Sequence, residues 1–399
     1  MSLPLEGITV VDCGQVIAGP TVAALLGDFG AEVIKVEDPR GGDQLRQFGR
    51  ERDGVSLHSK LISRNKKSIT VNLRDERGQA LLCRLIAAVE ADVLVESFRP
   101  GTLERWNLGS DRLKAIRPEL VLVRVSGFGQ TGPYRNRPGF GTLAEAMSGF
   151  AHVTGEANGP PTLPPFALAD HVAALYGALG ALVSLYLRDA CGRGEGQEID
   201  VSLLESLFSA LGIYLVEYDQ LGIVPQRQGN RTASAPRNTY PTADGRWIAV
   251  AGSTQSITAR LFRAIGRPEL EHDPRFRSNR DRLQNVEELD RIVTEWVSAR
   301  SQREAIETLL AADVAAAPVM DVRDLATDPH LAAREAIAIV ADEQLGTIRL
   351  PNVQPRLAET PGAVRHAGPA AGAHTTEILR ERLGLNAAEI EHLQEQEVV

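Results

Sequence analysis

The amino-acid sequence predicts an α/β protein with a parallel β-sheet in a large domain and a second, smaller domain. Between residues 7 and 126, short apolar runs alternate with segments of helical spacing, which is the pattern of successive βαβ units. A chain of 399 residues is also too long for one ordinary hydrophobic core. A hairpin pattern followed by three helical segments after residue 238 predicts where the second domain lies.

The elements are expected in a fixed order along the chain. The expected strands cover residues 7–12, 30–37, 67–73, 92–96 and 120–126, and the expected helices cover 20–29, 76–89 and 103–116. An apolar helical stretch covers 166–186, and a short strand runs into a helix over 198–208. A β-hairpin over 238–251 turns at Asp244-Gly245, and helices follow over 256–264, 286–299 and 301–312.

These elements divide the chain into four ranges. Residues 1–205 are expected to form the first segment of the large domain. Residues 206–229 are expected to form a linker, because the stretch from Gln220 to Asn238 is polar. Residues 230–320 are expected to form the small domain, and 321–399 a return linker and the C-terminal segment of the large domain.

Composition excludes several classes of protein. The chain has 43% hydrophobic and 24% charged residues, which are values of a globular protein. Its net charge of −9 argues against nucleic acid as a partner. The three cysteines lack metal-type spacing, the N-terminus lacks a signal-peptide pattern, and the longest apolar run, Val172–Leu187, is shorter than a membrane span of about 20 residues. We therefore expect a cytoplasmic protein with no membrane partner.

The carboxyl ends of the expected parallel strands predict the ligand site, because ligands bind beyond these ends in open parallel sheets. The segments that follow the strands contain Arg40, Arg99, Arg105, Arg135 and Arg137. Each arginine alone could be a solvated surface charge, but five at one edge of an acidic protein favour a phosphate-bearing ligand. The turn after the first strand, Cys13–Pro20, is not a G-x-G-x-x-G fingerprint. It is either a plain tight turn or a phosphate-binding helix start.

Asp170 stands at the head of the apolar stretch 166–186, just after Pro164-Pro165. From Val172 onward this helix is apolar on every side, which predicts a buried helix, and Gly177 and Gly180 would let other backbones approach closely. One interpretation of Asp170 is a helix cap. The other is a carboxylate nucleophile at the mouth of a buried helix.

Several catalytic and metal-binding motifs are absent from the sequence. It has no G-x-S-x-G, no H-E-x-x-H, no paired Cys-x-x-Cys and no G-x-x-x-x-G-K motif. The eight histidines are scattered without ligand spacing. No metal site is therefore expected, and the remaining candidates are the phosphate-suited strand edge and Asp170.

The chain resembles the class III CoA-transferases, a family that includes formyl-CoA transferase and the carnitine and bile-acid CoA-transferases. The resemblance covers essentially the whole length, and its motifs occur in the family order. They are Leu5–Pro20, Gly30–Glu37 with Gly41-Gly-Asp43, Asn65–Ser68, Ala91–Gly101, Ser126–Pro133 and Leu383–Glu391.

The resemblance implies a Rossmann-like large CoA-binding domain, a smaller α/β domain, and ring-shaped subunits interlocked in a homodimer. It identifies Asp170 as the catalytic residue. It also implies CoA contacts at Val16, Ile17, Ala18, Leu73, Arg74, Ser97, Phe98, Arg99, Arg105, Arg137, Gly139, Phe140 and Gly141.

Three positions depart from formyl-CoA transferase. That enzyme has Gln where Ile17 stands, Arg where Asp38 stands and Asn where Ser97 stands. We expect Arg40 to replace the lost arginine as a CoA contact. Oxalate-using members have a glycine-rich lid loop with no counterpart around residues 230–260, so oxalate is not the expected acceptor.

The family reaction moves CoA from an acyl-CoA donor to a free carboxylic acid, through an aspartyl mixed anhydride and an aspartyl-CoA thioester. It needs no permanently bound cofactor, because acyl-CoA is itself the substrate. One alternative is an α-methylacyl-CoA racemase, whose His-Asp pair is replaced here by Phe140-Gly141. The other is a CoA-binding protein without catalysis. The sequence does not identify the acyl-CoA donor or the acid.

Overall fold

The computed structural model describes residues 3–252 and 254–399, which form two compact units. The larger unit contains the residues up to Ala151, together with Leu163–Ile223 and His330–Val399. The smaller unit contains His152–Thr162 and Val224–Pro329. Each unit is therefore assembled from segments that are distant in the sequence.

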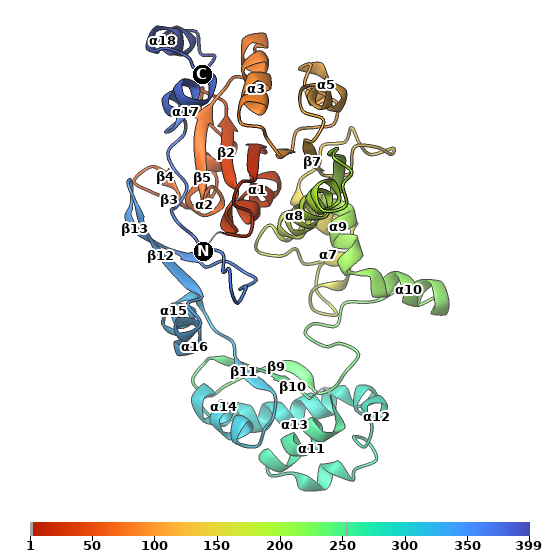
Figure 1. Ribbon diagram of the computed structural model, residues 1–399. Helices are drawn as coiled ribbons and strands as arrows, with labels where there is room; N and C mark the ends of the chain where they lie inside the picture. The colour runs from red at the N-terminus through yellow and green to blue at the C-terminus, as the bar shows by residue number, and fades with distance from the viewer. Residues whose placement is uncertain (1–2, 253) are drawn as a thin grey trace. The chain divides into compact units, whose positions relative to one another are not determined.

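The larger unit is built on a six-stranded parallel sheet with the strand order β5-β2-β1-β6-β7-β8 (Figure 1). The strands are β1 (Thr9–Cys13), β2 (Glu32–Glu37), β5 (Lys66–Thr70), β6 (Val93–Glu96), β7 (Val121–Ser126) and β8 (Glu198–Ser202). The predicted α/β class and the parallel sheet are confirmed. The strand order reverses direction between β1 and β6, and such a point opens a crevice beyond the strands.

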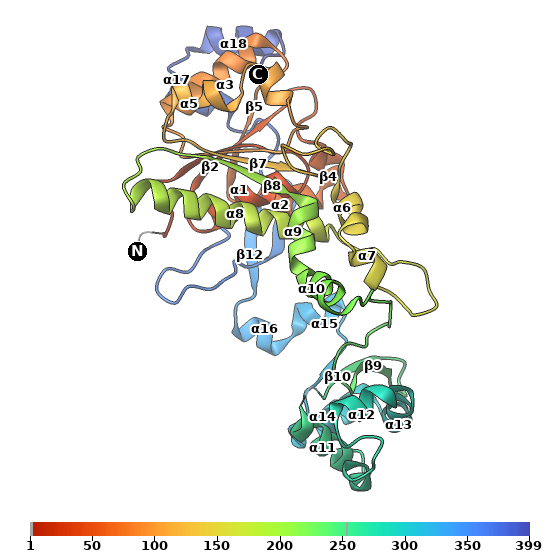
Figure 2. The same ribbon diagram turned by 90° about the vertical axis from the view of Figure 1, so that its right-hand side faces the viewer.

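Helices cover both faces of this sheet (Figure 2). One face carries α1 (Ala18–Asp28) and α8 (Leu168–Asp189), which pack on the sheet through alanine and valine side chains. The other face carries α3 (Glu76–Ala88), α5 (Ser110–Ile116), α17 (Thr375–Leu383) and α18 (Ala387–Glu395). The last two helices belong to the C-terminal segment, so the end of the chain completes a core that its first part begins.

One expected helix is divided in two. The range 103–116 contains α4 (Thr102–Arg105) and α5 rather than a single helix. Asn107 has a φ of 53°, in the left-handed region, and Gly109 is the extended residue that precedes α5. A left-handed residue ends a helix, and asparagine tolerates this conformation better than most residues.

Helix α8 has one buried side and one exposed side. A Cβ atom on Gly177 would lie 2.7 Å from Val22 of α1, and one on Gly180 would lie 3.0 Å from Ile199 of β8, so both glycines allow close packing as expected. The prediction of a helix buried on every side is wrong for the single chain. Its opposite side exposes large apolar side chains, namely Leu175, Tyr176, Leu179, Leu182, Val183 and Tyr186.

Helix α8 is also, within residues 3–252 and 254–399, the one helix long and apolar enough to cross a membrane by length and composition. The helix has 22 residues, Leu168–Asp189, and therefore begins two residues and ends three residues after the expected stretch 166–186. Its alanine-rich side packs on α1 and on the sheet.

Further elements of the larger unit surround the sheet. They are η1 (Gln44–Gln47), β3 (Glu51–Arg52), β4 (Val55–Ser56), α2 (Leu57–Ile62), α6 (Gly141–Met147), α9 (Leu203–Ala210), α10 (Gly212–Leu221), β12 (Ile337–Asp342) and β13 (Gly346–Pro351). Helices α7 (Phe150–Val153) and α16 (Pro329–Ala333) fall where the chain passes between units. The range 206–229, expected as a linker, thus contains most of α9 and all of α10.

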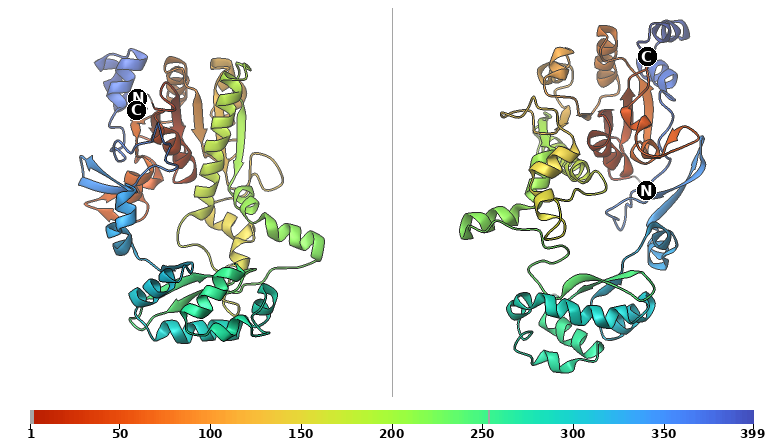
Figure 3. Two further views of the ribbon diagram at one scale, coloured as in Figure 1. Left: turned by 60° about the horizontal axis from the view of Figure 1, so that its bottom comes forward. Right: turned by 180° about the vertical axis from the view of Figure 1, so that it is seen from behind.

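The smaller unit is a three-stranded antiparallel sheet packed against helices (Figure 3). Its strands are β9 (Arg237–Pro241), β10 (Trp247–Ala251) and β11 (Ala316–Pro318). Its helices are α11 (Gln255–Ala264), η2 (Pro268–Glu271), α12 (Asn279–Gln284), α13 (Val286–Ser298), α14 (Gln302–Ala311) and α15 (Val322–Thr327). The predicted hairpin at Asp244-Gly245 and the three predicted helices are confirmed. The range 230–260 includes residue 253, which lies outside the described residues.

Candidate active site

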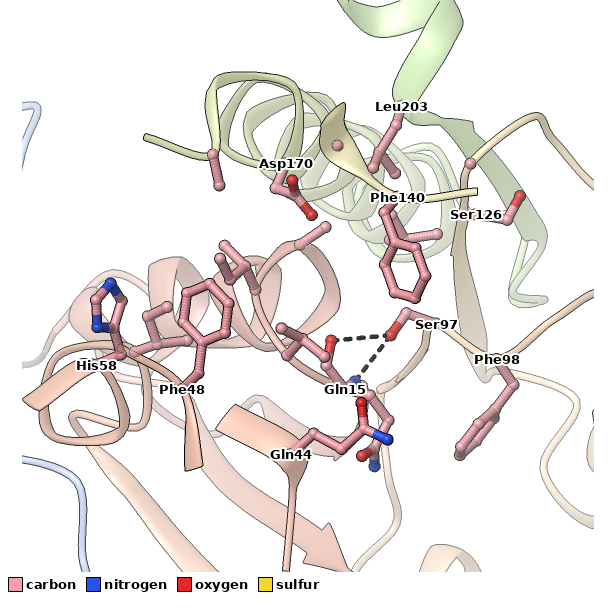
Figure 4. Close-up of a pocket in the computed structure, with 18 of the residues that line it drawn as sticks. Gln15, Gln44, Phe48, His58, Ser97, Phe98, Ser126, Phe140, Asp170 and Leu203 are labelled. Atoms are coloured by element: carbon pink, nitrogen blue, oxygen red, sulfur yellow. Dashed lines mark hydrogen bonds between the residues drawn. The ribbon is translucent and has the colours of Figure 1, made fainter. Parts of the chain in front are cut away.

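A cavity of about 1640 Å³ lies in the larger unit, and the turns that follow β1, β2, β6 and β7 line it (Figure 4). Asp170, near the start of α8, also lines it. The sequence predicted a ligand site at this edge because the carboxyl ends of parallel strands meet there. The turns after β1 and β6, on either side of the point where the strand order reverses, both contribute to the wall.

Ser97 and Gln15 join these two turns. The Gln15 backbone N–H donates to Ser97 Oγ at 2.8 Å, and Ser97 Oγ is 3.3 Å from the Gln15 carbonyl oxygen that accepts its proton (Figure 4). The two residues are 82 positions apart in the sequence. One hydroxyl group therefore satisfies both backbone groups of Gln15 and fixes the turn after β1 against the turn after β6.

Buried charges lie beneath the turn after β1. Lys35 and Lys66 project from β2 and β5 and are almost fully buried, with Asp12 between them. Burial lowers the pKa of Lys35, but Asp12, Asp43 and Glu37 outweigh it and hold that pKa above its usual value. Burial lowers the pKa of Lys66 despite the attraction of Asp12. Charges buried in this way are costly unless they are paired and hydrogen-bonded.

Asp170 lies in the first turn of α8 but does not cap it. The residue that precedes the helix is Ala167, and no side chain caps this end. Among the described residues, the Asp170 carboxylate forms no hydrogen bond with another residue. Burial raises its pKa to about 6; His171 lowers the value and Glu145 raises it further. Asp170 is therefore a weakly solvated, unpaired carboxylate on the wall of the cavity, and the helix-cap interpretation is wrong.

Helix α6 brings two residues against Asp170. A Cβ atom on Gly141 would lie 2.0 Å from Asp170 Oδ2, so the carboxylate occupies the space of a side chain at position 141. Glu145, one turn further along, is 3% exposed, and its Oε1 accepts from the Ala169 N–H at 3.3 Å. The Leu168 and His171 N–H groups donate to backbone carbonyls of the preceding turn. The Leu168, Ala169 and His171 amides at the start of α8 thus already have acceptors outside the Asp170 side chain.

Two arginines that follow other strands also line the cavity. Arg40 and Arg74 both line it and both contact Asp38. Arg40 Nε is 3.1 Å from Asp38 Oδ1, and Arg74 Nη1 contacts Asp38 Oδ2. Burial raises the pKa of Asp38, but the two arginines outweigh it and hold that pKa below its usual value. Asp38, where formyl-CoA transferase has arginine, therefore pairs with two cations that line the cavity.

Most residues expected to contact CoA line this one cavity. They are Val16, Ile17, Ala18, Arg40, Leu73, Arg74, Ser97, Phe98, Arg99, Gly139, Phe140 and Gly141. Arg105, Arg135 and Arg137 are not among its lining residues. Arg105 donates to Thr102 Oγ1 at 2.8 Å, and the Arg137 guanidinium lies 3.6 Å from the centre of the Tyr134 ring. A CoA contact at Arg105 or Arg137 stays a prediction.

Sequence reasoning missed several residues of the site. Glu145 could not be identified from the sequence, because no motif or spacing links it to Asp170. Phe48 and His58 also line the cavity, with their rings edge-on at 5.1 Å (Figure 4). Lys35 did leave a signal, since a lysine interrupts the apolar run of β2 and every position of that strand after Glu32 is buried. A charge inside a buried strand must have a partner.

The cavity offers one chemical feature suited to group transfer, an unpaired carboxylate in a wall that also contains Arg40, Arg74 and Arg99. In the part of the chain that the structure describes, no group of three or more His, Cys, Asp or Glu residues is arranged to hold a metal ion. The three cysteines are unpaired, and burial raises the pKa of the Cys13 thiol well above its usual value. Asp170 is therefore the nucleophile candidate on the cavity wall.

Comparisons with known proteins point the same way. The sequence model of CoA-transferase family III matches residues 5–375. The chain is 42% identical to succinyl-CoA–D-citramalate CoA-transferase of Chloroflexus aurantiacus, covering 99% of this chain and 98% of that protein. It is 32% identical to human succinyl-CoA:glutarate CoA-transferase, covering 95% and 86%.

A solved structure agrees over nearly the whole fold. The crystal structure of a CAIB/BAIF family protein from Brucella suis superimposes with a TM-score of 0.84 and 32% sequence identity. It covers 96% of this chain and 100% of that protein. Sequence and fold therefore agree, and the chain belongs to CoA-transferase family III.

Proposed function

We propose that this protein moves CoA from an acyl-CoA to a free carboxylic acid, with Asp170 as the covalent nucleophile. One observation carries the mechanism: the Asp170 carboxylate lies on the cavity wall without a hydrogen-bonding partner among the described residues. A carboxylate that only stabilised the fold would be paired or would cap a helix. Membership of the CoA-transferase family supports the reaction class.

The reaction proceeds by two exchanges at Asp170. An Asp170 oxygen attacks the thioester carbonyl, the C–S bond breaks, and CoA leaves as a thiolate from an aspartyl mixed anhydride. The thiolate then attacks the Asp170 carbonyl and releases the donor acid, which gives an aspartyl-CoA thioester. The acceptor carboxylate attacks this thioester, the C–S bond breaks, and CoA again leaves as a thiolate from a second anhydride. CoA thiolate finally attacks the acceptor's acyl carbon, and Asp170 leaves as the free carboxylate.

The surroundings of Asp170 suit a nucleophile. With a pKa of about 6 the carboxylate is mostly ionised at neutral pH, so it needs no general base. Its partial burial leaves few water molecules to stabilise the charge before attack. The same burial protects the anhydride from hydrolysis. Because Gly141 has no side chain, the carboxylate can occupy this position on the cavity wall.

We place CoA along the crevice between the turns after β1 and β6, with its thioester end at Asp170. The turn residues 16–18 and the segment 97–99 form the walls, and Arg40, Arg74 and Arg99 supply positive charge for its phosphates. Phe98 stands edge-on to Trp106 at 5.0 Å, which offers an apolar surface to the remainder of the molecule.

For the donor and acceptor we start from the relatives. The names of the two relatives described above contain succinyl-CoA together with D-citramalate or glutarate. We propose succinyl-CoA and a short dicarboxylic acid as the first substrate pair to test on this protein.

We also propose that the protein is an interlocked homodimer in the cytoplasm. Besides the exposed apolar side of α8, helix α10 also exposes apolar side chains, namely Ile213, Val216, Tyr218 and Leu221. An apolar surface of this kind is unusual on a monomer and typical of an obligate interface. Free cysteines fit a reducing compartment.

The test combines turnover with trapping of the intermediate. Purified protein is incubated with succinyl-CoA and a panel of carboxylic acids, and new acyl-CoA thioesters are identified by mass spectrometry. Hydroxylamine added during turnover should leave a hydroxamate on Asp170. Asp170→Asn, which has nearly the same shape, should give neither thioester nor hydroxamate. Transfer by Asp170→Asn at a rate close to that of the parent would overturn the mechanism.

A further inference from the structure

The backbone at Val16 has a conformation that valine normally avoids. Its φ is 60°, in the left-handed region, where a β-branched side chain is a genuine outlier. Such a conformation persists only where the surroundings hold it, and it concentrates at functional sites. Val16 lines the cavity that contains Asp170. It also packs in a small apolar cluster with Ile17, Leu45, Ile62 and Ala167.

Two buried side chains hold this turn. Asp43 Oδ1 accepts the Val16 N–H at 2.8 Å, and Asp43 Oδ2 lies 3.0 Å from Lys35 Nζ. Lys35 Nζ also donates to the Gly14 carbonyl oxygen. The pair therefore forms hydrogen bonds with the backbone on both sides of Gln15, at Gly14 and at Val16. Asp43 is 2% exposed and Lys35 is 1% exposed, so neither pair member is in contact with bulk water.

The pair is itself fixed from the strands below. Glu37 Oε2 accepts the Asp43 N–H at 2.9 Å, and Arg46 holds Glu37 through two hydrogen bonds of 2.6 Å. Lys35 extends from β2, beside β1, where its register partner is Asp12. A buried ion pair contributes little to stability compared with apolar residues of the same volume. Stability alone therefore does not account for a charged pair at this place.

We propose that Lys35 and Asp43 are positioning residues that hold Val16 in its left-handed conformation and so keep the turn after β1 in the shape that receives the thioester end of acyl-CoA. The inference rests on the proposed function. It follows from the contacts of the turn: Val16 and Ile17 face the cavity, and their cluster reaches Ala167, three residues before Asp170. Without the pair, Val16 would relax to negative φ and move this wall of the site.

The inference makes Val16 the point through which the pair acts, and this allows a rescue experiment. The paired substitution Lys35→Met/Asp43→Asn removes both charges together, so that neither is left buried alone. We expect the kcat/KM for acyl-CoA to fall at least about tenfold, because displacing a reacting group by a small distance is costly. Adding Val16→Gly should return kcat/KM to within about threefold of Val16→Gly alone, since glycine adopts positive φ freely.

A matched control is a buried lysine–aspartate pair away from the cavity, Lys60 and Asp342. Its Nζ and Oδ2 atoms are 2.7 Å apart, both side chains are buried, and neither residue lines the cavity. Lys60→Met/Asp342→Asn should keep the parental kcat/KM. Adding Val16→Gly to this control variant should change kcat/KM by the same factor as adding Val16→Gly to the parent. This control separates loss of any buried pair from loss of the pair at Val16.

The result that overturns the inference is a paired variant as active as the parent, or one that Val16→Gly fails to rescue. If the paired variant is not recovered folded, Asp43→Asn alone is compared with Asp43→Asn/Val16→Gly. If Val16→Gly restores neither the folding nor the activity of Asp43→Asn, this result also contradicts the inference. CoA binding by calorimetry is measured on every variant. Absence of transfer by the parent would refute the proposed function, while the binding comparison still decides the role of the pair.

Discussion

Gly141 and Asp170 share one space: a single methyl group on Gly141 would lie 2.0 Å from Asp170 Oδ2. This distance is well below any van der Waals contact, so a side chain at position 141 and the present carboxylate position exclude each other. Gly141 begins α6 and Asp170 stands in the first turn of α8. The two helix starts together determine where the carboxylate points.

The first prediction concerns this contact. Gly141→Ala should push the Asp170 carboxylate from its position and lower kcat/KM about a hundredfold, the cost of misplacing a reacting group by about 1 Å. CoA affinity, measured by calorimetry, should change little. Gly212→Ala is the control, because a Cβ there meets nothing within 4 Å and Gly212 begins a helix. Parental activity in Gly141→Ala would show that Asp170 is free to act from another position.

The second prediction is a pH profile. Only the ionised carboxylate attacks, and burial raises the pKa of Asp170 to about 6. The kcat/KM for acyl-CoA should therefore be constant above about pH 7 and fall about tenfold per unit below pH 6. Glu145→Gln removes a nearby negative charge and should shift the midpoint downward. A profile that stays flat between pH 5 and 7 would contradict the assignment of Asp170 as the titrating nucleophile.

The third prediction concerns stability. A carboxyl group whose pKa is raised by folding destabilises the folded protein above that pKa, and the penalty vanishes below the unfolded value of about 3.9. Asp170→Asn should therefore raise the melting temperature at pH 7–8 by a few degrees. The difference should shrink as the pH falls from 6 toward 4. Differential scanning fluorimetry across this range measures it, and a lower melting temperature at pH 8 would mean that Asp170 is paired.

The fourth prediction concerns Arg40 and Arg74, which line the cavity. Arg40→Ala and Arg74→Ala should each weaken CoA binding about three- to tenfold, a loss that shrinks at high salt because both side chains are exposed. Arg323→Ala is the control, because Arg323 pairs with Asp321 two residues away, as Arg40 does with Asp38. Unchanged affinity in both cavity variants would place the CoA phosphates elsewhere.

The fifth prediction concerns assembly. Leu179 and Val183 stand on the exposed side of α8, and in a homodimer they would be covered. Leu179→Glu should therefore reduce the yield of folded dimer measured by size-exclusion chromatography with light scattering. Val322→Glu, at a more exposed apolar residue of the smaller unit, should leave the yield unchanged. A parent that is a folded monomer at nanomolar concentration would refute the interlocked arrangement.

Much of the fold could be predicted because the strands and helices follow from local patterns of apolar and polar residues. The apolar runs at β1, β2, β6 and β7 have strand length, and the segments between them have helical spacing, so the parallel sheet and its ligand edge follow. The break between α4 and α5 was missed, since a left-handed Asn107 is compatible with a helical pattern of side chains on either side. Local periodicity does not record single backbone angles.

By itself, the sequence determined the α/β class, the edge of the sheet at which the cavity lies, and Asp170 as the candidate nucleophile. Only the tertiary structure decided that Asp170 caps nothing, that Gly141 makes room for it, and that Lys35 reaches Asp43 under the turn at Val16. It also decided that one side of α8 stays exposed. These are relations between side chains from different elements, 29 residues apart for Gly141 and Asp170. A local pattern specifies which side of a helix or strand is apolar. Only the packing of the elements determines which atoms a given side chain contacts.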